Sequence, residues 1–391
     1  MFINFWYPII RSEDLSVEIP EKVMVLGVNL VAFRDKAGEA HVLSDTCVHR
    51  GASLGGPWSA GSNVPRIVND CIVCPYHGWE FDGNGQCQNI PSIGYEEKVL
   101  ARAKVDSYPV QEKYGIVFAF LGDLPKEERL SLLDIDEYGQ EGWRANQVLV
   151  LEVDYYYERS IENALDPAHN EFVHPTHGFT AMNRDTYRVN EYNTEDHQQG
   201  WGMWFMHKFN APPLKKDIWD EARTESGDLW AGSGTYGPNT VITHINIQPN
   251  AGFRQYFFEQ PVSENKTRIF FINMRNLMLD AKHDGPIHAR NKAIAKQDID
   301  ILEVLHPTLT PIGNTREVLM PADNAVIAYR KWLKKFDDAG WRIDMEEFHR
   351  RNGKDVAFAI PSPGRRNSKN WVVEAIPLKK KRAVHRLSKA S

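Results

Sequence analysis

Apolar and polar residues alternate with a period of two in the first part of the chain. The alternation covers residues 21–46 around the turn-like segment DKAGEA, and YGIVFAFLG at 114–122 is a further strand-like run. Successive side chains of a β-strand point to opposite faces, so this pattern predicts strands joined by a hairpin. We therefore expect an antiparallel β domain over residues 1–122.

The second part of the chain combines strand and helix patterns. Residues 286–306 and 324–340 predict amphipathic helices. The apolar stripe of the first helix consists of Ile294, Ile301, Leu302 and Leu305. Strand-like segments come before these helices, at 146–157, 201–210, 240–248, 253–260 and 267–274. Long antiparallel strands together with a few helices predict an α+β fold.

The patterns divide the chain into four segments. Residues 125–142 (PKEERLSLLDIDEYGQEG) are polar and acidic, which is typical of a connecting region. The predicted organisation is a β domain at 1–122, a linker region at 123–144, a larger domain at 145–378 and a basic tail at 379–391. Two folded units are therefore expected, and a chain of 391 residues is long enough to form two hydrophobic cores.

The composition is that of an ordinary globular protein, with 42% hydrophobic and 25% charged residues. A net charge of −6 argues against nucleic acid as the main partner. No run approaches the ~20 apolar residues that span a bilayer, and the start of the chain lacks the features of a signal peptide. Four cysteines are too few for a secreted disulfide scaffold, so we expect a cytoplasmic location.

Two short motifs place cysteine and histidine at metal-binding spacing, C-V-H at 47–49 and C-P-Y-H at 74–77. A Rieske [2Fe–2S] cluster needs this combination, because thiolates hold one iron and imidazoles hold the other. A zinc site uses the same ligand types, but a one-residue C-x-H spacing is cramped around a single ion. The Rieske cluster is therefore favoured, and its predicted ligands are Cys47, His49, Cys74 and His77.

The surrounding sequence resembles the Rieske domain of ring-hydroxylating non-haem iron oxygenases. The resemblance rests on CVHRGASLGG (47–56) and CPYHGWEFDGNGQCQNIPS (74–92). The two ligand motifs are 24 residues apart, more than is usual in the family, and the extra length lies in the Gly-, Ser- and Pro-rich segment 56–70. We expect that segment to be a surface excursion. Cys71 lacks the P-Y-H-G-W context of Cys74 and is not expected to be a ligand.

A second group of candidate ligands lies at 161–177 (IENALDPAHNEFVHPTH), in a predicted helix that Pro167 interrupts. The candidates are Asp166, His169, His174 and His177. An iron(II) that activates O2 needs two histidines and one carboxylate on one face, with the other face open. His169 and His174 are about 500° apart around a helix, so only an irregularity near Pro167 would bring them together.

The pattern E-N-x-x-D-x-x-H-x(4)-H at 162–174 resembles the catalytic motif of the same oxygenase family. The resemblance implies that His169 and His174 bind a mononuclear iron and that Asp298, on a later helix, is the third ligand. Asp300 is the rival carboxylate, but two residues further on it faces a different side of the helix. His177 lies outside the motif and is expected to be a loop residue.

The resemblance also gives Asp166 a role between the two metal centres. In the family, the cluster of one subunit serves the iron of the next subunit in a head-to-tail trimer. By resemblance, Asp166 would link the partner subunit's His77 to His169. Asn163 is a candidate, on weaker grounds, for a residue that contacts the metal ligands. The alternative is that Asp166 only forms the turn before Pro167.

Taken together, the resemblance implies the terminal oxygenase of a Rieske non-haem iron system. A Rieske domain would be followed by a helix-grip-like catalytic domain in a homotrimer. The chain has no G-x-G-x-x-G fingerprint and no second cysteine cluster, so a ferredoxin and/or a ferredoxin reductase would have to deliver electrons from NAD(P)H. The reaction would use O2 to hydroxylate, dioxygenate or demethylate a small aromatic or polycyclic substrate.

Four features remain open from the sequence. A Rieske electron-transfer protein with a non-catalytic ligand-binding domain is the main alternative, and a zinc-stabilised binding protein is a third. The basic tail is either solvated or attracts an acidic electron donor. A group of aromatic residues either walls a pocket or is plain core: Trp201, Trp204, Phe205, Tyr256 and Phe257. The substrate itself cannot be deduced from the sequence.

Overall fold

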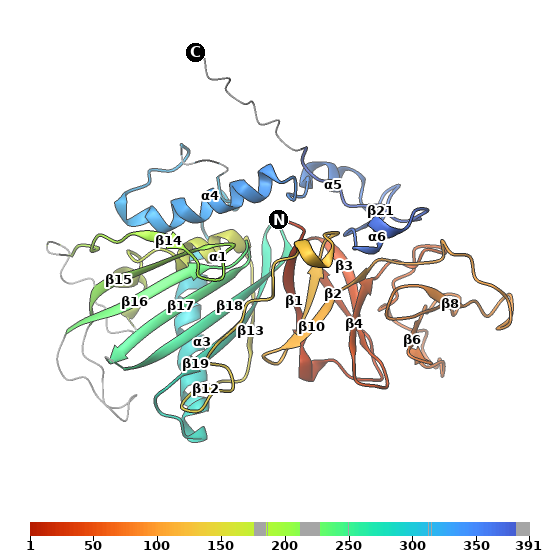
Figure 1. Cartoon of the computed structure of the whole chain (residues 1–391), viewed down its shortest axis with the longest axis horizontal. Coiled ribbons are helices and arrows are strands. Elements are labelled where there is room, and N and C mark those ends of the chain that lie inside the picture. Colours follow the sequence, from red (N-terminus) through yellow and green to blue (C-terminus); the bar gives the residue numbers. More distant parts are fainter. Residues whose placement is uncertain are drawn as a thin grey trace, which may run out of the picture.

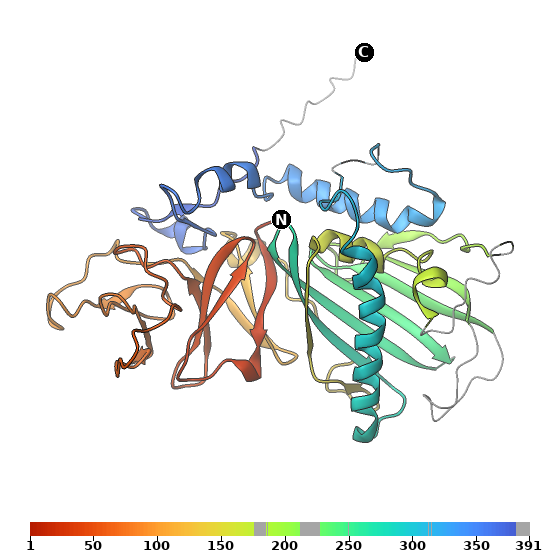
Figure 2. The ribbon, with the colours of Figure 1, turned by 180° about the vertical axis from the view of Figure 1, so that it is seen from behind.

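The computed structural model describes residues 1–175, 185, 187–211, 227–248, 250–311, 313 and 315–380. Figure 1 shows a smaller β domain, coloured red to orange, beside a larger domain built on one wide green sheet. In the opposite view of Figure 2, one long helix crosses the face of that sheet. This arrangement confirms the predicted α+β fold class. None of the described helices has both the length and the apolar character needed to cross a membrane.

The N-terminal domain consists of three small antiparallel sheets. The first sheet contains β1 (Phe5–Arg11), β10 (Val110–Lys113) and β11 (Ile116–Leu121). The second contains β2 (Glu21–Val25), β3 (Val28–Arg34), β4 (Ala40–Ser44) and β9 (Ser107–Tyr108). The third contains β5 (Ile67–Val68), β6 (Cys71–Val73), β7 (Glu80–Phe81) and β8 (Cys87–Asn89).

The alternation over residues 21–46 contains one more turn than the sequence pattern indicated. β2 and β3 form a tight hairpin through Leu26 and Gly27, whose φ angles are +56° and +79°. Two successive positive φ angles are typical of the two-residue turns that match the twist of a hairpin. The second hairpin, between β3 and β4, occupies the predicted position around DKAGEA.

The expected surface excursion at 56–70 is shorter than predicted. Residues 57–66 contain no strand and are exposed or half-buried. Ile67 and Val68, however, form β5 and pair with β6, which leads into the second ligand motif. The end of the extra segment is therefore part of the sheet that supports the ligand loops.

The larger domain is built on an eight-stranded antiparallel sheet of order β12-β19-β18-β17-β16-β15-β14, in which β13 also pairs with β19. Its strands are β12 (Arg144–Ala145), β13 (Leu149–Val153), β14 (Thr194–Asp196), β15 (Met203–Ala211), β16 (Gly227–Thr235), β17 (Thr240–Gln248), β18 (Ala251–Ser263) and β19 (Lys266–Arg275). The sequence pattern missed β16, whose GDLWAGSGT contains three glycines. Glycine is depleted in strands, so this segment gives little strand signal.

The helices that the structure describes belong to the larger domain and to the C-terminal segment. They are α1 (Tyr157–Ala164), α2 (Asn170–Val173), α3 (Asp284–Leu302), α4 (Asn324–Asp338), α5 (Met345–Arg351) and α6 (Gly364–Asn367). α3 ends four residues before its predicted end at 306, close to Pro307, which disfavours helical backbone in the residue before it. Ile301 was placed wrongly on the apolar stripe: it is 48% exposed, whereas Ile299 and Leu302 pack into the core.

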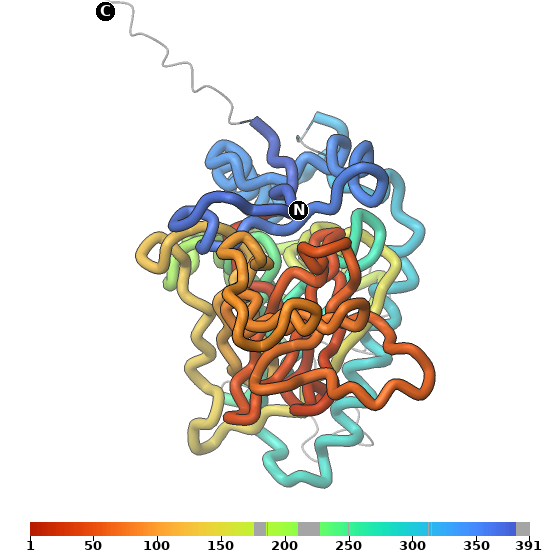
Figure 3. The backbone as a smooth tube through the Cα atoms, turned by 90° about the vertical axis from the view of Figure 1, so that its right-hand side faces the viewer, coloured from red at the N-terminus to blue at the C-terminus, as the bar shows by residue number. Residues whose placement is uncertain are grey.

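The two domains share one continuous core. In the predicted linker region, Leu130, Leu132 and Leu133 are buried in the same cluster as residues of both domains. Residues from 341 to 378 return across the molecule, and β20 (Phe358–Ala359) pairs in parallel with β21 (Glu374–Ala375). Figure 3 shows this blue C-terminal segment lying over the top of the N-terminal domain.

One buried carboxylate attaches the C-terminal segment to the N-terminal domain. Asp106 is 1% exposed and accepts hydrogen bonds from Arg365 Nε and Nη2 at 2.8 and 2.6 Å. It also accepts from the backbone nitrogen and hydroxyl of Ser362 at 2.9 and 2.8 Å. Four charge-assisted or polar contacts therefore converge on one side chain that is excluded from water.

Asp106→Ala should destabilise the protein by about 3–5 kcal/mol, because it leaves a partly buried guanidinium without its partner. Denaturant unfolding followed by circular dichroism measures this loss. Asp123→Ala is the matched control, since Asp123 pairs with Arg366 at a more exposed site. That variant should lose no more than about 1 kcal/mol. Equal losses in the two variants would contradict the role given to Asp106.

Candidate metal centres

The two ligand motifs of the N-terminal domain form loops of the same shape. In the first loop the nitrogen of Gly51 donates to the carbonyl of Cys47 at 2.9 Å, and in the second Gly78 donates to Cys74 at 3.0 Å. Both glycines have positive φ, +75° and +72°, which an L side chain rarely adopts. The glycine four residues after each cysteine therefore lets both loops close in the same way.

The four predicted cluster ligands lie together at the tips of these loops. The Cys47 and Cys74 side chains are buried and share a hydrogen bond, which lowers the pKa of the Cys74 thiol to about 6. His49 and His77 are exposed, and their Nδ1 atoms lie 3.1 Å apart. The Trp79 ring stacks on His49 at a centroid distance of 4.6 Å. Two buried cysteine sulfur atoms and two exposed imidazoles match the ligand set of a Rieske cluster.

Cys71, the rival thiol, lies ahead of the second loop. It is part of strand β6, and burial raises the pKa of its thiol to about 12. The thiol of Cys47 shares its hydrogen bond with Cys74. The structure thus brings Cys74, and not Cys71, to Cys47.

The second candidate centre lies where the helix of residues 157–173 is interrupted. α1 ends at Ala164, and the single turn of α2 begins at Asn170, so the predicted interruption by Pro167 is present. His169 precedes α2, and His174 follows it with a backbone ψ of +69°, outside the helical range. This change of direction brings together two imidazoles that a regular helix would have separated.

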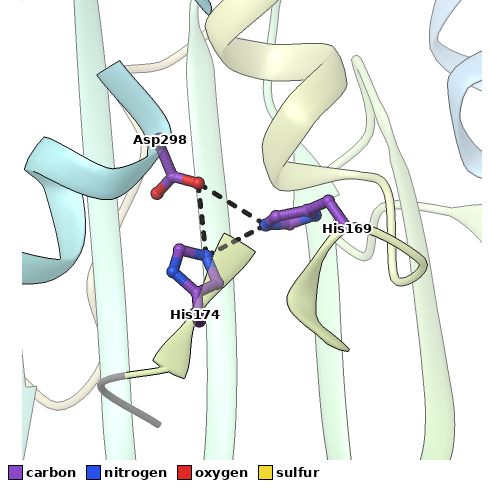
Figure 4. Close-up of side chains that lie close together, drawn as sticks. All are labelled: His169, His174 and Asp298. Atoms are coloured by element: carbon purple, nitrogen blue, oxygen red, sulfur yellow. Dashed lines mark hydrogen bonds and ion pairs between the residues drawn. The ribbon is translucent and has the colours of Figure 1, made fainter. Parts of the chain in front are cut away.

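Three side chains converge at this point, as Figure 4 shows. His169 Nε2 and His174 Nε2 are 3.2 Å apart. Asp298 Oδ1, from α3, lies 3.6 Å from His169 Nε2 and 3.2 Å from His174 Nε2. Two imidazoles and one carboxylate on one side, grouped closely enough to hold a single metal ion, form the facial arrangement of non-haem iron(II) sites.

Hydrogen bonds fix the orientation of each of these side chains. His169 Nδ1 donates to the carbonyl oxygen of Asp166 at 2.6 Å, and His174 Nδ1 donates to Gln297 Oε1 at 3.1 Å. Both rings thereby turn Nε2 toward the point at which a metal ion would lie. Asn163 Nδ2 donates to Asp298 Oδ1 at 3.1 Å. Such outer contacts orient metal ligands.

The three groups influence one another's ionisation. Burial lowers the pKa of His169, which favours the neutral ring that a metal requires. Asp298 is half-buried, and burial favours its neutral form, yet its hydrogen bond with His174 and the charge of both imidazoles hold its pKa below the usual range. For His174 burial opposes protonation, but the Asp298 carboxylate outweighs it and raises the pKa of the ring.

The remaining predicted residues lie around this group. Asp300 faces away: its side chain is 55% exposed and pairs with Lys296. The carboxylate of Asp166 lies 3.9 Å from His169 Nδ1 and accepts from the backbone nitrogen of Ala168 at 2.7 Å. Asp166 thus contacts His169 mainly through its backbone carbonyl. His177 lies outside the described residues.

Sequence reasoning did not identify Gln297. Its signal was weak, because a glutamine beside an acidic residue on a polar helix is common. Only the position of Gln297 next to Asp298, within reach of His174, distinguishes it.

Two family profiles match the chain. Residues 5–109 match the Rieske [2Fe-2S] domain, and residues 153–339 match the vanillate O-demethylase oxygenase C-terminal domain. The chain belongs to the Rieske oxygenases. This membership confirms the family resemblance seen in the two ligand motifs. It also implies a Rieske cluster and a mononuclear iron as cofactors, and the donor sets described above fit both.

Curated relatives of this Rieske oxygenase have varied names. It is 30% identical to chlorophyllide a oxygenase of Chlamydomonas reinhardtii over 346 residues, 84% of this chain and 47% of that protein. It is 31% identical to cholesterol 7-desaturase nvd 1 of Ciona intestinalis over 198 residues, 50% of this chain and 40% of the relative. The chain thus spans less than half the length of these two relatives.

Solved structures share the fold. NdmA of Pseudomonas putida CBB5 with caffeine has a TM-score of 0.66 at 22% identity, covering 89% of this chain and 92% of that one. Apo dicamba monooxygenase has a TM-score of 0.66 at 21% identity, covering 90% of this chain and 99% of that one.

A cavity of about 1000 Å³ opens beside the three converging side chains. One face of the eight-stranded sheet forms one wall, and α1 and α3 form the other. His169, His174 and Asp298 are part of its lining. A metal ion at this position would therefore face the space in which an organic molecule could bind.

The aromatic residues that the sequence left open, as a pocket wall or as plain core, divide between the two faces of the sheet. Phe205 and Phe257 line the cavity. Tyr256 points to the other face, where its hydroxyl donates to Glu137 at 2.9 Å, and Trp201 stacks on Phe336. Side chains of a strand alternate between faces, so neighbouring aromatic residues could not all line one pocket.

Asp298→Ala should weaken binding of one iron(II) per chain by more than about 100-fold, since even the loss of an outer contact typically costs 10–100-fold. Anaerobic iron(II) titration of the purified protein measures the affinity. Asp300→Ala, two residues away on the same helix, should bind iron(II) like the unsubstituted chain. If Asp300→Ala weakened iron(II) binding and Asp298→Ala did not, Asp300 would be the metal ligand.

Proposed function

We propose that the chain is the terminal oxygenase component of a Rieske non-haem iron system. It would use O2 and electrons from NAD(P)H to hydroxylate, dioxygenate or demethylate a small organic substrate. The observation that carries this proposal is the convergence of His169, His174 and Asp298 at the wall of a large cavity. The alternative, a Rieske electron-transfer protein, gives no reason for a metal-binding triad at that position.

In this proposal Cys47, His49, Cys74 and His77 hold the [2Fe–2S] cluster. The exposed imidazoles suit electron entry and exit, because they are the part of the site that another protein can touch. The buried thiols lie within an apolar cluster that includes Val31, Leu43 and Ile72, which keeps water from the sulfur atoms. Burial and hydrogen bonding are among the factors that set the potential of such a cluster.

His169, His174 and Asp298 would hold the mononuclear iron(II), which when bound supplies O2 activation. The residues of the chain hold that site in shape. Asp166 and Gln297 fix which ring nitrogen of each histidine faces the metal, and Asn163 restrains the carboxylate. The open side of the triad faces the cavity, so substrate could approach from there.

We infer that electrons pass between subunits, not within one chain. The ligand loops belong to the N-terminal domain at one end of the molecule, whereas α2 and α3 lie in the domain at the other end (Figures 1 and 2). A head-to-tail homotrimer would bring the partner subunit's His77 to Asp166. The Asp166 side chain is 29% exposed, which leaves it accessible to such a contact.

The electron donor would be a ferredoxin and/or a ferredoxin reductase, since nothing in the sequence marks a nicotinamide- or flavin-binding domain. We keep the cytoplasm as the proposed location, on the cysteine content. The proposed substrate is aromatic or polycyclic, which the size of the cavity and its Phe205, Phe257 and Phe271 lining support. Relatives named for chlorobenzoate, phenoxybenzoate and methylxanthine point the same way.

His169→Ala should abolish oxygenation while leaving the Rieske absorption spectrum unchanged, because it removes an iron ligand and no cluster ligand. The assay supplies NADH, a ferredoxin–reductase pair, labelled ¹⁸O2 and a panel of aromatic compounds, and mass spectrometry detects labelled product. His349→Ala, an exposed histidine far along the chain, is the control and should retain activity. A cluster that is reduced and reoxidised without labelled product in the unsubstituted protein would favour the electron-transfer alternative.

Asp166→Asn should keep both metal sites and lose most coupled turnover, since the neutral amide weakens the proposed link between subunits. Stopped-flow spectroscopy of the prereduced protein would follow reoxidation of the cluster by O2 and substrate. We expect reoxidation to slow by at least about tenfold, the effect of ~1.4 kcal/mol on a barrier. Unchanged reoxidation would remove Asp166 from the electron path.

A further inference from the structure

Strand β18 sends alternate side chains into the cavity. Phe253, Gln255, Phe257 and Glu259 all line it, as the period of two along a strand requires. Glu259 differs from the others because it is an ionisable group that is only 1% exposed. A glutamate in such a position is uncommon unless it is paired.

Only one of the two carboxyl oxygens of Glu259 has a hydrogen-bond partner among the described residues. Its Oε1 accepts a hydrogen bond from Ser160 Oγ at 2.7 Å, and the same hydroxyl contacts the side chain of Tyr155. Its Oε2 is buried and has no hydrogen-bond partner among the residues that the structure describes. The backbone groups of Glu259 are both paired with Asn239, so the unmet bond belongs to the side chain.

Four other polar side chains that line the cavity have partners within it. Ser233 and Thr243 share a hydrogen bond of 3.2 Å, and Lys208 pairs with Asp228 at 2.6 Å. An unpaired buried polar atom is costly and calls for an explanation. At the wall of a cavity, the simplest explanation is a partner that arrives with a ligand.

The chemistry of the group favours a neutral partner. No cation is paired with Glu259 in the described part of the chain, and burial raises the pKa of its carboxyl group to about 8. Near neutral pH the group is therefore mainly protonated and can donate a hydrogen bond. Its natural partners are neutral acceptors such as hydroxyl, carbonyl or ether oxygens.

Glu259 also lies close to the triad along α1. Ser160 contacts Glu259, and Asn163, three residues later, contacts Asp298. Residues three apart on a helix are neighbours on one face, about 5–6 Å apart between Cβ atoms. A substituent held by Glu259 would therefore place the adjoining part of a substrate next to the triad.

We propose that Glu259 is a substrate-recognition residue whose free carboxyl oxygen bonds to a neutral oxygen-bearing group on an otherwise apolar substrate. The proposal rests on the proposed function, and it narrows the substrate class from aromatic compounds in general to oxygenated ones. Ser160 acts as the positioning residue that holds the other carboxyl oxygen.

The test uses two probe pairs that differ by one oxygen: naphthalene with 2-naphthol, and phenanthrene with 9-phenanthrol. Equilibrium binding to the purified holoprotein should favour the hydroxylated member of a pair. Glu259→Leu should weaken binding of that member about five- to tenfold, the effect of losing one hydrogen bond, without affecting the hydrocarbon. Glu259→Gln keeps a donor and the contact with Ser160, so it should retain the preference.

Infrared difference spectroscopy gives a second readout. The carbonyl stretch of a protonated carboxylic acid should shift when the hydroxylated probe binds, and it should be absent from both Glu259 variants. Glu152→Gln, a substitution of an exposed glutamate on β13, is the control and should change neither readout. Neither readout requires turnover or the triad, so failure of the oxygenase assignment remains distinguishable.

Three outcomes would overturn the proposal. They are no preference for the hydroxylated probes, a Glu259→Leu variant that keeps the preference, and failure of the unsubstituted protein to bind any of the four probes. The second outcome would mean that water alone satisfies Glu259 Oε2.

Discussion

The structure of the larger domain depends on one constraint: two histidines five residues apart must present their Nε2 atoms to the same point. A continuous helix cannot meet this constraint, and the chain meets it by ending α1 before Pro167 and forming a single separate turn. α3, on the same wall of the cavity, then supplies Asp298 beside the two histidines. Because Asn163 and Gln297 tie these segments together, the position of α1 against α3 is set by the same contacts that shape the site.

The N-terminal domain meets a comparable constraint with loops. Each ligand loop closes through a glycine with positive φ; the first loop follows β4, and the second connects β6 to β7. The C-terminal segment, attached through Asp106, fixes this domain to the rest of the chain. The two candidate sites lie in different domains of one chain, and this separation is the basis of the proposed trimer.

The sequence predicted the fold class, the ligand motifs and most long strands, because these depend on local patterns. It missed β16, whose glycines hide the strand, and it misplaced Ile301, because the helix axis is fixed by tertiary packing. Asp298 could be favoured over Asp300 only by resemblance, since the face that a helix presents is set by what it packs against. The partners Gln297 and Ser160 could not be predicted, because each acts through a contact between distant segments.

The central claim is that this chain carries two kinds of iron centre with different roles. Anaerobic analysis of iron, zinc and acid-labile sulfide in the purified protein, with a visible spectrum of the same sample, tests it most directly. The account predicts three irons and two sulfides per chain, with Rieske-type absorption. Two irons and two sulfides that do not change after iron(II) reconstitution would contradict it, as would a protein that contains zinc alone.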